Sequence, residues 1–308
     1  MRSAFFDTLV RLAEDDERIT LVVGDLGFGV IEPFARRFPD RFLNAGVAEQ
    51  NLTGIAAGMA LSGKIVFTYS IANFPTLRCL EQIRNDVCYH EANVKIVAVG
   101  GGFAYGPLGM THHATEDLAI MRALPGMIVV APGDPVEVEG ATRAIAAHAG
   151  PCYLRLGRAG EPTVHPPDLV FKLGRAIRVR EGHDVTLVVT GGLLATAVAA
   201  SDRLRPTGIS VRVLSMHTTK PVDDAEIVAA AQETRGIVTL EEHSVIGGLG
   251  SAVAEILAES PEGKVPFKRL GLPSAFATEI GSQDYLRRAY RLSEEAVADS
   301  IEQLLRAT

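Results

Sequence analysis

The feature that most constrains the fold of this 308-residue chain is an alternation of short β-branched runs with longer helical patterns. The short runs are largely apolar, which is typical of strands buried on both faces. They lie at 19–23, 65–69, 94–99, 127–131 and 153–156. The helical patterns lie between them, at 5–15, 48–62, 77–90 and 116–124. This rhythm predicts an α/β fold in which a mostly parallel sheet carries helices on both faces.

A proline-rich break separates this unit from a second one. Residues 158–167 (RAGEPTVHPP) hold three prolines and a glycine, and proline fixes φ and removes a backbone donor. Beyond the break, strands are predicted at 184–190, 209–214 and 236–240, with helices at 195–204, 223–232 and 250–259. We therefore predict two α/β domains, 1–158 and 181–308, joined by a linker at 159–180.

The composition excludes several classes of protein. The 30 Lys and Arg against 37 Asp and Glu give a net charge of −7 without a basic block, so neither nucleic acid nor an anionic membrane is expected as a partner. Cys79, Cys88 and Cys152 lack the spacing of a disulfide framework or a zinc site. The apolar runs are too short to cross a bilayer and the N-terminus lacks a secretory pattern, so a reducing, cytoplasmic location is expected.

Glu49 is the first candidate site residue. It is the only charge in the stretch 46–61, GVAEQNLTGIAAGMAL, which is otherwise small and apolar. Small residues allow close packing against a neighbour or a ligand, and an acid there would be desolvated. An acid in a first helical turn also simply favours the helix dipole. The residues alone leave both interpretations open.

Two further segments have the same ambiguity. Aromatic side chains lie in the second half of the strand at 65–69 and just after it, and could wall a flat ligand or belong to the core: Phe67, Tyr69 and Phe74. The stretch 99–109 holds five glycines and runs into Thr111-His112-His113 before a helix, which predicts a loop that approaches something closely. Adjacent histidines do not readily face one metal ion, and no dinucleotide motif is present.

The last two segments favour structural interpretations. Arg155 and Arg158 end a strand, where they would bind an anion or form ion pairs. The segment 239–257 (TLEEHSVIGGLGSAVAEIL) is similar to a phosphate-binding glycine loop, but Glu241 and Glu242 would repel phosphate there and no lysine follows. It therefore predicts tight strand-to-helix packing or an interface.

In this order and spacing, the segments resemble the C-terminal half of a transketolase, that is, its pyrimidine-binding domain followed by its C-terminal domain. The blocks that carry the resemblance are FLNAGVAEQNLTGIAAGMA, the strand end with Phe74, THHATEDLAIMRALP, LRLGR and VTLEEHSVIGGLGSAVAE. Looser forms occur in deoxyxylulose-phosphate synthases and in the β subunits of 2-oxoacid dehydrogenases. The resemblance implies a thiamine-diphosphate-binding fold and transfer of a two-carbon ketol unit from a ketose-type donor to a sugar or acyl acceptor.

The family's magnesium site is not found in this sequence. In the family, a GDG motif and an asparagine some thirty residues on hold Mg²⁺, whereas the only Gly-Asp pairs here are Gly24-Asp25 and Gly133-Asp134, without that continuation. A diphosphate needs a hard cation on oxygen ligands. The resemblance therefore implies a split enzyme in which this chain is the β subunit, a separate α subunit brings the Mg²⁺ ligands, and an α₂β₂ assembly forms two sites.

The resemblance assigns the cofactor contacts to five residues. Glu49 would donate a hydrogen bond to N1′ of the aminopyrimidine ring and favour the imino tautomer, which removes the proton from thiazolium C2. Phe74, with Tyr69 and Phe67, would stack on or wall that ring. Ile71 stands where transketolases tend to have another aromatic residue, so this wall would be partly aliphatic.

It assigns four more residues to the cofactor's surroundings and the substrate. His112 matches a histidine that contacts substrate oxygens and shuttles protons, and His113 is a second candidate. Arg158 matches an arginine that grips substrate phosphate. Asp25, in GDLG, matches an aspartate near the cofactor.

Three departures from the family pattern predict an altered substrate preference. Sugar-phosphate transketolases carry an aspartate where this chain has Leu108, a histidine where it has Gly100–Gly102, and a serine within Gly27-Phe28-Gly29. Polar substrate contacts are therefore missing, and turnover of xylulose 5-phosphate should be poor. Two alternatives stay open: an oxoacid dehydrogenase β-type or deoxyxylulose-phosphate-synthase-like enzyme, and a non-catalytic scaffold subunit.

Overall fold

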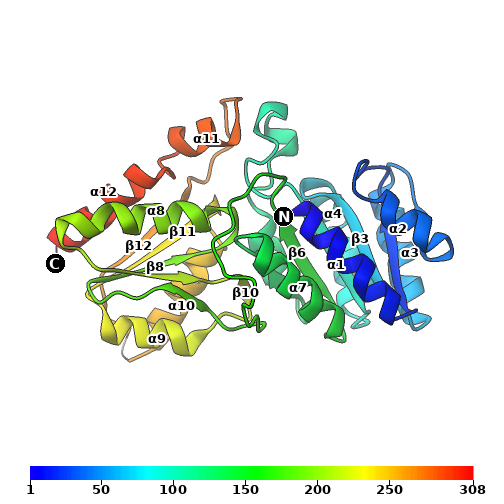
Figure 1. Ribbon diagram of the computed structural model, residues 1–308, viewed down its shortest axis with the longest axis horizontal. Helices are drawn as coiled ribbons and strands as arrows, with labels where there is room; N and C mark the ends of the chain where they lie inside the picture. Colours follow the sequence, from blue (N-terminus) through cyan, green and yellow to red (C-terminus); the bar gives the residue numbers. More distant parts are fainter. Residues whose placement is uncertain (262, 308) are drawn as a thin grey trace.

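The computed structural model describes residues 1–261 and 263–307, and within these the chain forms two sheets side by side (Figure 1). The larger sheet has the strand order β10-β5-β6-β4-β3-β1-β2, and the smaller has the order β12-β11-β8-β9-β7. Neighbouring strands run parallel, except that β10 is antiparallel to β5 and β7 to β9. The predicted α/β fold with two mostly parallel sheets is confirmed.

The larger sheet has a fully buried centre. Its strands from the first half of the chain are β1 (Ile19–Val23), β2 (Phe42–Asn44), β3 (Ile65–Ile71), β4 (Val94–Val99), β5 (Ile128–Val130) and β6 (Cys152–Leu156). Every residue of β1, β4 and β6 is buried. Both faces are covered, so these strands are continuous apolar runs rather than alternating ones.

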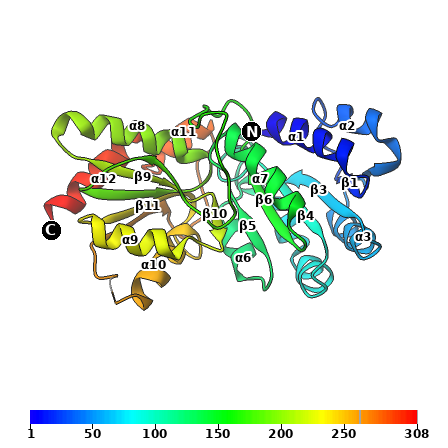
Figure 2. The same cartoon turned by 60° about the horizontal axis from the view of Figure 1, so that its bottom comes forward.

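Helices cover both faces of this sheet, as Figure 2 shows. On one face lie α1 (Arg2–Asp15), α2 (Glu32–Arg37) and α7 (Pro135–Ala147), and on the other α3 (Glu49–Leu61), the π-helical η2 (Ile83–Cys88) and α6 (Asp117–Ala123). Phe5 and Leu9 of α1 pack in the first layer, whereas Leu52, Ile83 and Leu118 pack in the second. The alternation of side chains along each strand therefore decides which layer a residue enters.

The smaller sheet repeats this arrangement. Its strands are β7 (Ile177–Arg180), β8 (Val185–Val189), β9 (Val211–Ser215), β11 (Ile237–Ser244) and β12 (Phe267–Leu272). One face carries α8 (Leu194–Leu204) and α12 (Glu294–Arg306), and the other carries α9 (Asp224–Glu233) and α10 (Leu249–Glu259). Ser293 caps α12 by accepting a hydrogen bond from the backbone N–H of Ala296, which fixes where that helix begins.

One strand from the second half of the sequence lies in the sheet formed by the first half. Strand β10 (Thr218–Lys220) comes from the second half but joins the larger sheet, where Thr218 pairs with Val130. The predicted linker, 159–180, ends in β7, which belongs to the smaller sheet. Strands of three or four residues carry no periodic pattern, so only the tertiary pairing reveals them. The domain limits 1–158 and 181–308 stay a prediction.

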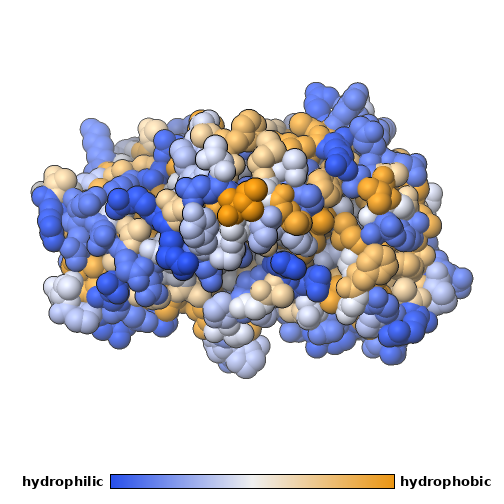
Figure 3. Space-filling model, turned by 90° about the horizontal axis from the view of Figure 1, so that it is seen from above, coloured by the Kyte–Doolittle hydropathy of each residue, from blue (hydrophilic) through white to orange (hydrophobic). Residues whose placement is uncertain are grey.

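The carboxyl ends of several parallel strands meet at the edge drawn uppermost in Figure 1. The connections there include α4 (Asn73–Leu77) and α5 (Leu80–Gln82) after β3, η3 (Gly106–Leu108) and η4 (Met110–His112) after β4, and α11 (Gln283–Ala289) after β12. Other short turns are η1 (Pro39–Arg41), η5 (Gly191–Leu193) and η6 (Arg205–Thr207). Figure 3 looks onto this edge, where hydrophobic patches lie among hydrophilic ones.

Candidate active site

Glu49 opens α3 and is almost wholly buried. Gly46, whose φ of 73° suits glycine, turns the chain after β2, and the helix starts at Glu49 without a side-chain cap. The Glu49 side chain is 4% exposed. Among the described residues, one group bonds its carboxylate: Nη1 of Arg78 donates to Oε2 at 3.2 Å. Burying a charge with a single partner is costly, so this position is more than a favourable helix start.

Arg78 connects Glu49 to an aromatic ring. Its guanidinium carbon lies 4.2 Å from the centroid of the Phe74 ring, a cation–π distance. The Phe74 ring in turn meets the His112 ring edge to face, with centroids 5.2 Å apart. The structure thus gathers Glu49, Phe74 and His112 around Arg78, a residue that no sequence motif singles out. The available signal was the four-residue spacing of Phe74 and Arg78, which is about one helical turn.

A cavity of about 510 Å³ opens beside Arg78, the partner of Glu49, while Glu49 itself is not among the residues that line it. Phe74, Arg78, His112 and His113 line it from the first domain, and Phe276 lines it from the segment after β12. Its size falls in the range of small-molecule sites. The second domain therefore contributes directly to the candidate site.

A second cavity of about 240 Å³ adjoins the first. The two share four lining residues, which are Thr115, Glu116, Phe276 and Ala277. The shared residues come from both domains, so the two cavities lie next to each other along the domain boundary.

The two histidines have different surroundings. His112 is half-buried, and its Nδ1 lies 3.0 Å from Oγ1 of Thr111. Nδ2 of Asn73 donates to the Thr111 carbonyl at 2.7 Å, which ties α4 to this turn. His113 is 4% exposed, with Nε2 3.3 Å from the Gly106 carbonyl, and its buried Nδ1 has no hydrogen-bond partner within the described part of the chain. That unpaired nitrogen lies in a residue that lines the larger cavity.

Phe67 and Tyr69 do not wall the cavity, so that prediction is wrong. Both are fully buried and pack under α1, where the Tyr69 ring lies 4.9 Å from that of Phe6 and the Phe67 ring 6.1 Å from that of Phe5. Burial also raises the pKa of the Tyr69 hydroxyl. Ile71 packs against the same cluster. These three residues share one face of β3 because side chains alternate along a strand, and α1 covers that face.

Asp25 and Arg158 line neither of the two cavities. Asp25 is exposed after β1 with a φ of 54°, and its Oδ1 accepts a hydrogen bond from Nδ2 of Asn44 at 2.9 Å. Arg158 is exposed, and its guanidinium lies over the Tyr105 ring, 5.3 Å from the centroid. The larger cavity is lined by Arg78, the partner of Glu49, but by neither Asp25 nor Arg158. Their predicted roles stay predictions.

The glycine-rich loop after β4 packs closely against other side chains of the protein rather than against a ligand site. A Cβ on Gly102 would lie 2.7 Å from the carboxyl carbon of Glu242 in β11, and one on Gly101 would lie 2.5 Å from Nε of Arg155. Oε1 of Glu242 accepts the Phe103 backbone N–H at 2.7 Å. Gly102 therefore allows the contact between the two domains, and Gly101 allows close packing against Arg155 within the first domain.

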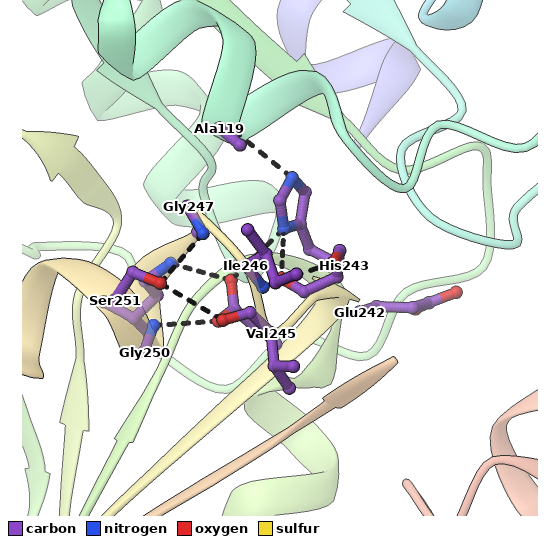
Figure 4. Close-up of polar contacts among 12 residues, drawn as sticks. Ala119, Glu242, His243, Val245, Ile246, Gly247, Gly250 and Ser251 are labelled. Atoms are coloured by element: carbon purple, nitrogen blue, oxygen red, sulfur yellow. Dashed lines mark hydrogen bonds and ion pairs between the residues drawn. The ribbon is translucent and has the colours of Figure 1, made fainter. Parts of the chain in front are cut away.

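The strand-to-helix segment around Glu241 also has a structural role, as predicted. The Glu241 carboxylate accepts the backbone N–H groups of Leu249 and Gly250 at 2.7 and 2.8 Å, so an acid occupies the start of α10 where a phosphate loop would place its ligand. Burial raises the pKa of Glu241 to about 7. Nδ1 of His243 lies 3.6 Å from Oε2 of Glu241. Figure 4 shows the other ring nitrogen of His243, Nε2, accepting the backbone N–H of Ala119. This segment joins the two domains.

The described residues offer neither a metal cluster nor a membrane span. Residues 1–261 and 263–307 contain no group of three or more His, Cys, Asp or Glu side chains arranged to hold a metal ion. Within the same ranges, none of the helices combines the length and apolar character that a bilayer crossing requires.

The fold and the site define a two-domain α/β protein with a ligand cavity at the shared edge of its sheets. The chain matches the transketolase pyrimidine binding domain over residues 1–161 and the transketolase C-terminal domain over residues 174–297. It is 41% identical over 298 residues to the B subunit of apulose-4-phosphate transketolase from Phocaeicola vulgatus, covering 96% of this chain and 94% of that one.

Two further relatives agree. The chain is 39% identical to the 6-deoxy-6-sulfo-D-fructose transketolase subunit SqwH of a Clostridium species, covering 96% of this chain and 92% of that one. A solved structure described as a split gene transketolase, inactive β4 tetramer, superposes with a TM-score of 0.90 at 40% identity, covering 99% and 97% of the two chains. The chain therefore belongs to the transketolase family. It corresponds to the C-terminal, β-type subunit of a split transketolase, which is a transferase.

Proposed function

We propose that this chain binds the aminopyrimidine half of thiamine diphosphate in the cavity beside Glu49 and acts only with a separate α subunit. One observation carries the proposal. The Glu49 carboxylate is buried, and the guanidinium of Arg78 both bonds to it and stacks on Phe74. A planar N–H donor, the Arg78 guanidinium, already makes both contacts. The carboxyl group and the ring therefore fit a flat heterocycle that shares a proton with the acid and stacks on Phe74.

The chain's own residues have defined tasks in this proposal. Bound thiamine diphosphate supplies the electron sink for transfer of a two-carbon unit. Glu49 holds a proton at its carboxylate and shares it with ring atom N1′, and its burial keeps water from competing for that proton. Phe74 orients the ring by stacking. His112, held by Thr111 and facing the cavity, moves protons to and from substrate oxygens, with His113 beside it.

A partner chain completes the site. A diphosphate needs a hard cation with oxygen ligands, and this sequence lacks the family's motif for Mg²⁺. We assign those ligands to the α subunit in an α₂β₂ enzyme with two sites. Relatives named as the B subunit of a transketolase and as a split-gene transketolase support this division. Its three cysteines are free thiols, which is in keeping with a cytoplasmic location.

The small-molecule substrate is a sugar or keto acid, and the proposed transfer runs from a ketose-type donor to an aldehyde, keto-sugar or acyl acceptor. Relatives named for apulose 4-phosphate and for 6-deoxy-6-sulfo-D-fructose support a ketose whose far end differs from that of common sugar phosphates. Arg158, exposed beside Tyr105, is the cation we assign to an anionic end of the substrate, and Asp25 is assigned to the cofactor's surroundings.

The test is Glu49→Gln in the enzyme reassembled with its α subunit. Loss of the shared proton should lower ketol transfer at least about 100-fold. Glu81→Gln, at an exposed acid in α5, is the matched control and should leave turnover unchanged. Unchanged turnover in the Glu49 variant would favour a scaffold role instead. Transfer to lipoamide rather than to an aldose would favour the oxoacid dehydrogenase alternative.

A further inference from the structure

Arg78 makes the two contacts that the proposed function assigns to the cofactor ring. Its Nη1 donates to Oε2 of Glu49 at 3.2 Å, and its guanidinium carbon lies 4.2 Å from the centroid of the Phe74 ring. A guanidinium is planar, carries N–H donors at its edge and stacks on aromatic faces. Like an aminopyrimidine, it is therefore a flat group that can stack on Phe74 while it forms a hydrogen bond with the carboxyl group of Glu49.

The Arg78 guanidinium and an aminopyrimidine ring cannot both contact Glu49 and Phe74 at the same time. The guanidinium that is bonded to Glu49 covers one face of the Phe74 ring. A second flat group at stacking distance on that face would overlap the arginine. The side chain of Arg78 must therefore move before a heterocycle reaches both Glu49 and Phe74.

Arg78 has room to move. Its side chain is 52% exposed, whereas that of Glu49 is 4% exposed. Its backbone is held in place, because Nε2 of Gln50 donates to the Arg78 carbonyl at 3.0 Å. Within the described part of the chain, the bond to Glu49 is the only hydrogen bond that its guanidinium makes. Because the backbone of Arg78 is held by Gln50, its side chain can break the bond to Glu49 and rotate outward while α3 and α4 stay in place.

We propose that Arg78 is a positioning residue that holds Glu49 and Phe74 in the cofactor-free chain and is displaced by thiamine diphosphate. This inference rests on the proposed function. A buried carboxylate without a partner would destabilise the chain, and Arg78 supplies that partner until the heterocycle replaces it. The arginine is thus an internal competitor of the cofactor, and its removal should tighten cofactor binding.

The experiment is calorimetric titration of thiamine diphosphate with Mg²⁺ into the reassembled complex carrying Arg78→Met. Methionine keeps a flexible apolar stem but removes the charge and the donors. The dissociation constant should fall about 3- to 10-fold, because the ion pair of the half-exposed Arg78 and its cation–π contact no longer compete with the cofactor. Arg84→Met, at an exposed arginine bonded to Asn85, is the matched control and should leave the affinity unchanged. An unchanged or weaker affinity in the Arg78 variant overturns the proposal.

A second measurement uses the free β chain without cofactor. Arg78→Met should lower its melting temperature, and the double variant with Glu49→Gln should recover most of that loss, because no buried charge is then left unpaired. An Arg78 variant as stable as the wild type would show that the Arg78–Glu49 pair does not stabilise the cofactor-free chain, and would overturn the proposal. If the wild-type complex does not bind thiamine diphosphate, the proposed function itself fails. If it binds and only the Arg78 variant behaves unexpectedly, the failure is confined to the arginine.

Discussion

The hydroxyl of Ser215, at the end of β9, donates to Oε1 of Glu137 in α7 at 2.5 Å, so a buried hydrogen bond joins the two domains. Oε2 of Glu137 accepts the Gly133 backbone N–H at 2.6 Å, and its own N–H donates to the N-cap Asp134 at 2.8 Å. His165 lies 3.5 Å from Glu137 and 3.2 Å from Asp134. Burial raises the pKa of Glu137 to about 7, against the opposing effects of His165 and these hydrogen bonds.

The raised pKa of Glu137 predicts a pH-dependent stability. An acid whose pKa is higher in the fold than in the unfolded chain stabilises the fold at low pH, and this contribution is lost as the pH rises from about 4.5 to about 7. Glu137→Gln imitates the protonated form at every pH. The free energy of unfolding of the variant relative to wild type should therefore increase by about 1–3 kcal/mol between pH 5 and pH 8. Urea titrations at several pH values measure this difference.

The control for this prediction is Glu139→Gln. Glu139 lies in the same helix but is 44% exposed. Its stability difference from wild type should stay nearly constant over the same pH range. A constant difference for Glu137→Gln as well would contradict the prediction, since the buried acid would then titrate alike in the folded and unfolded chain.

The ion pair of Arg155 and Asp117 should be a major source of stability. Nε of Arg155 donates to Oδ2 of Asp117 at 2.8 Å with both side chains buried, and the Tyr153 hydroxyl donates to the same oxygen at 2.6 Å. Arg155→Met leaves a buried carboxylate without its cation and should cost about 3–5 kcal/mol of unfolding free energy. Arg143→Met, which breaks the exposed pair with Glu139, should cost less than about 1 kcal/mol. Equal losses in urea unfolding would be inconsistent with this argument.

Much of the fold could be predicted because local pattern and tertiary environment agree. The strands at 19–23 and 94–99 have the predicted limits, since a run buried on both faces has one chemical character from end to end. Strand β10 was not predictable in this way. Thr218–Lys220 is polar and short, and it forms a strand only because the edge of β5 is free to pair with it.

The site was predicted in part for a similar reason. Glu49 and Phe74 stand out as a lone acid and a ring at a turn, and the structure brings them together through Arg78. Phe67 and Tyr69 were misplaced because the alternation along a strand shows that two residues share a face, but not which helix covers that face. The only local signal for Arg78 is its four-residue spacing from Phe74, and this spacing does not reveal its bond to Glu49, which depends on where α3 and α4 meet.

The corrected position of Tyr69 gives a prediction about cofactor binding. Its hydroxyl is buried without a hydrogen-bond partner among the described residues, so Tyr69→Phe should leave thiamine diphosphate affinity unchanged and keep or slightly raise the melting temperature. Phe74→Leu should weaken the affinity about 10-fold, since the stacking face is lost. Calorimetry on the two reassembled variants separates them. Weaker binding by the Tyr69 variant would return that residue to the wall of the site.

Leu108 predicts the donor preference of the assembled enzyme. It is 54% exposed at the end of η3, in the loop that carries His112, where the family pattern has a hydroxyl-reading aspartate. An apolar side chain there cannot accept a hydrogen bond from a sugar hydroxyl, so kcat/KM for xylulose 5-phosphate should be low. Leu108→Asp restores one acceptor and should raise kcat/KM for that donor about 10-fold, the value of one charged hydrogen bond. The matched control is Leu61→Asp, at an exposed leucine at the end of α3, which should have no such effect. Efficient turnover of xylulose 5-phosphate by the unaltered enzyme would refute the predicted preference.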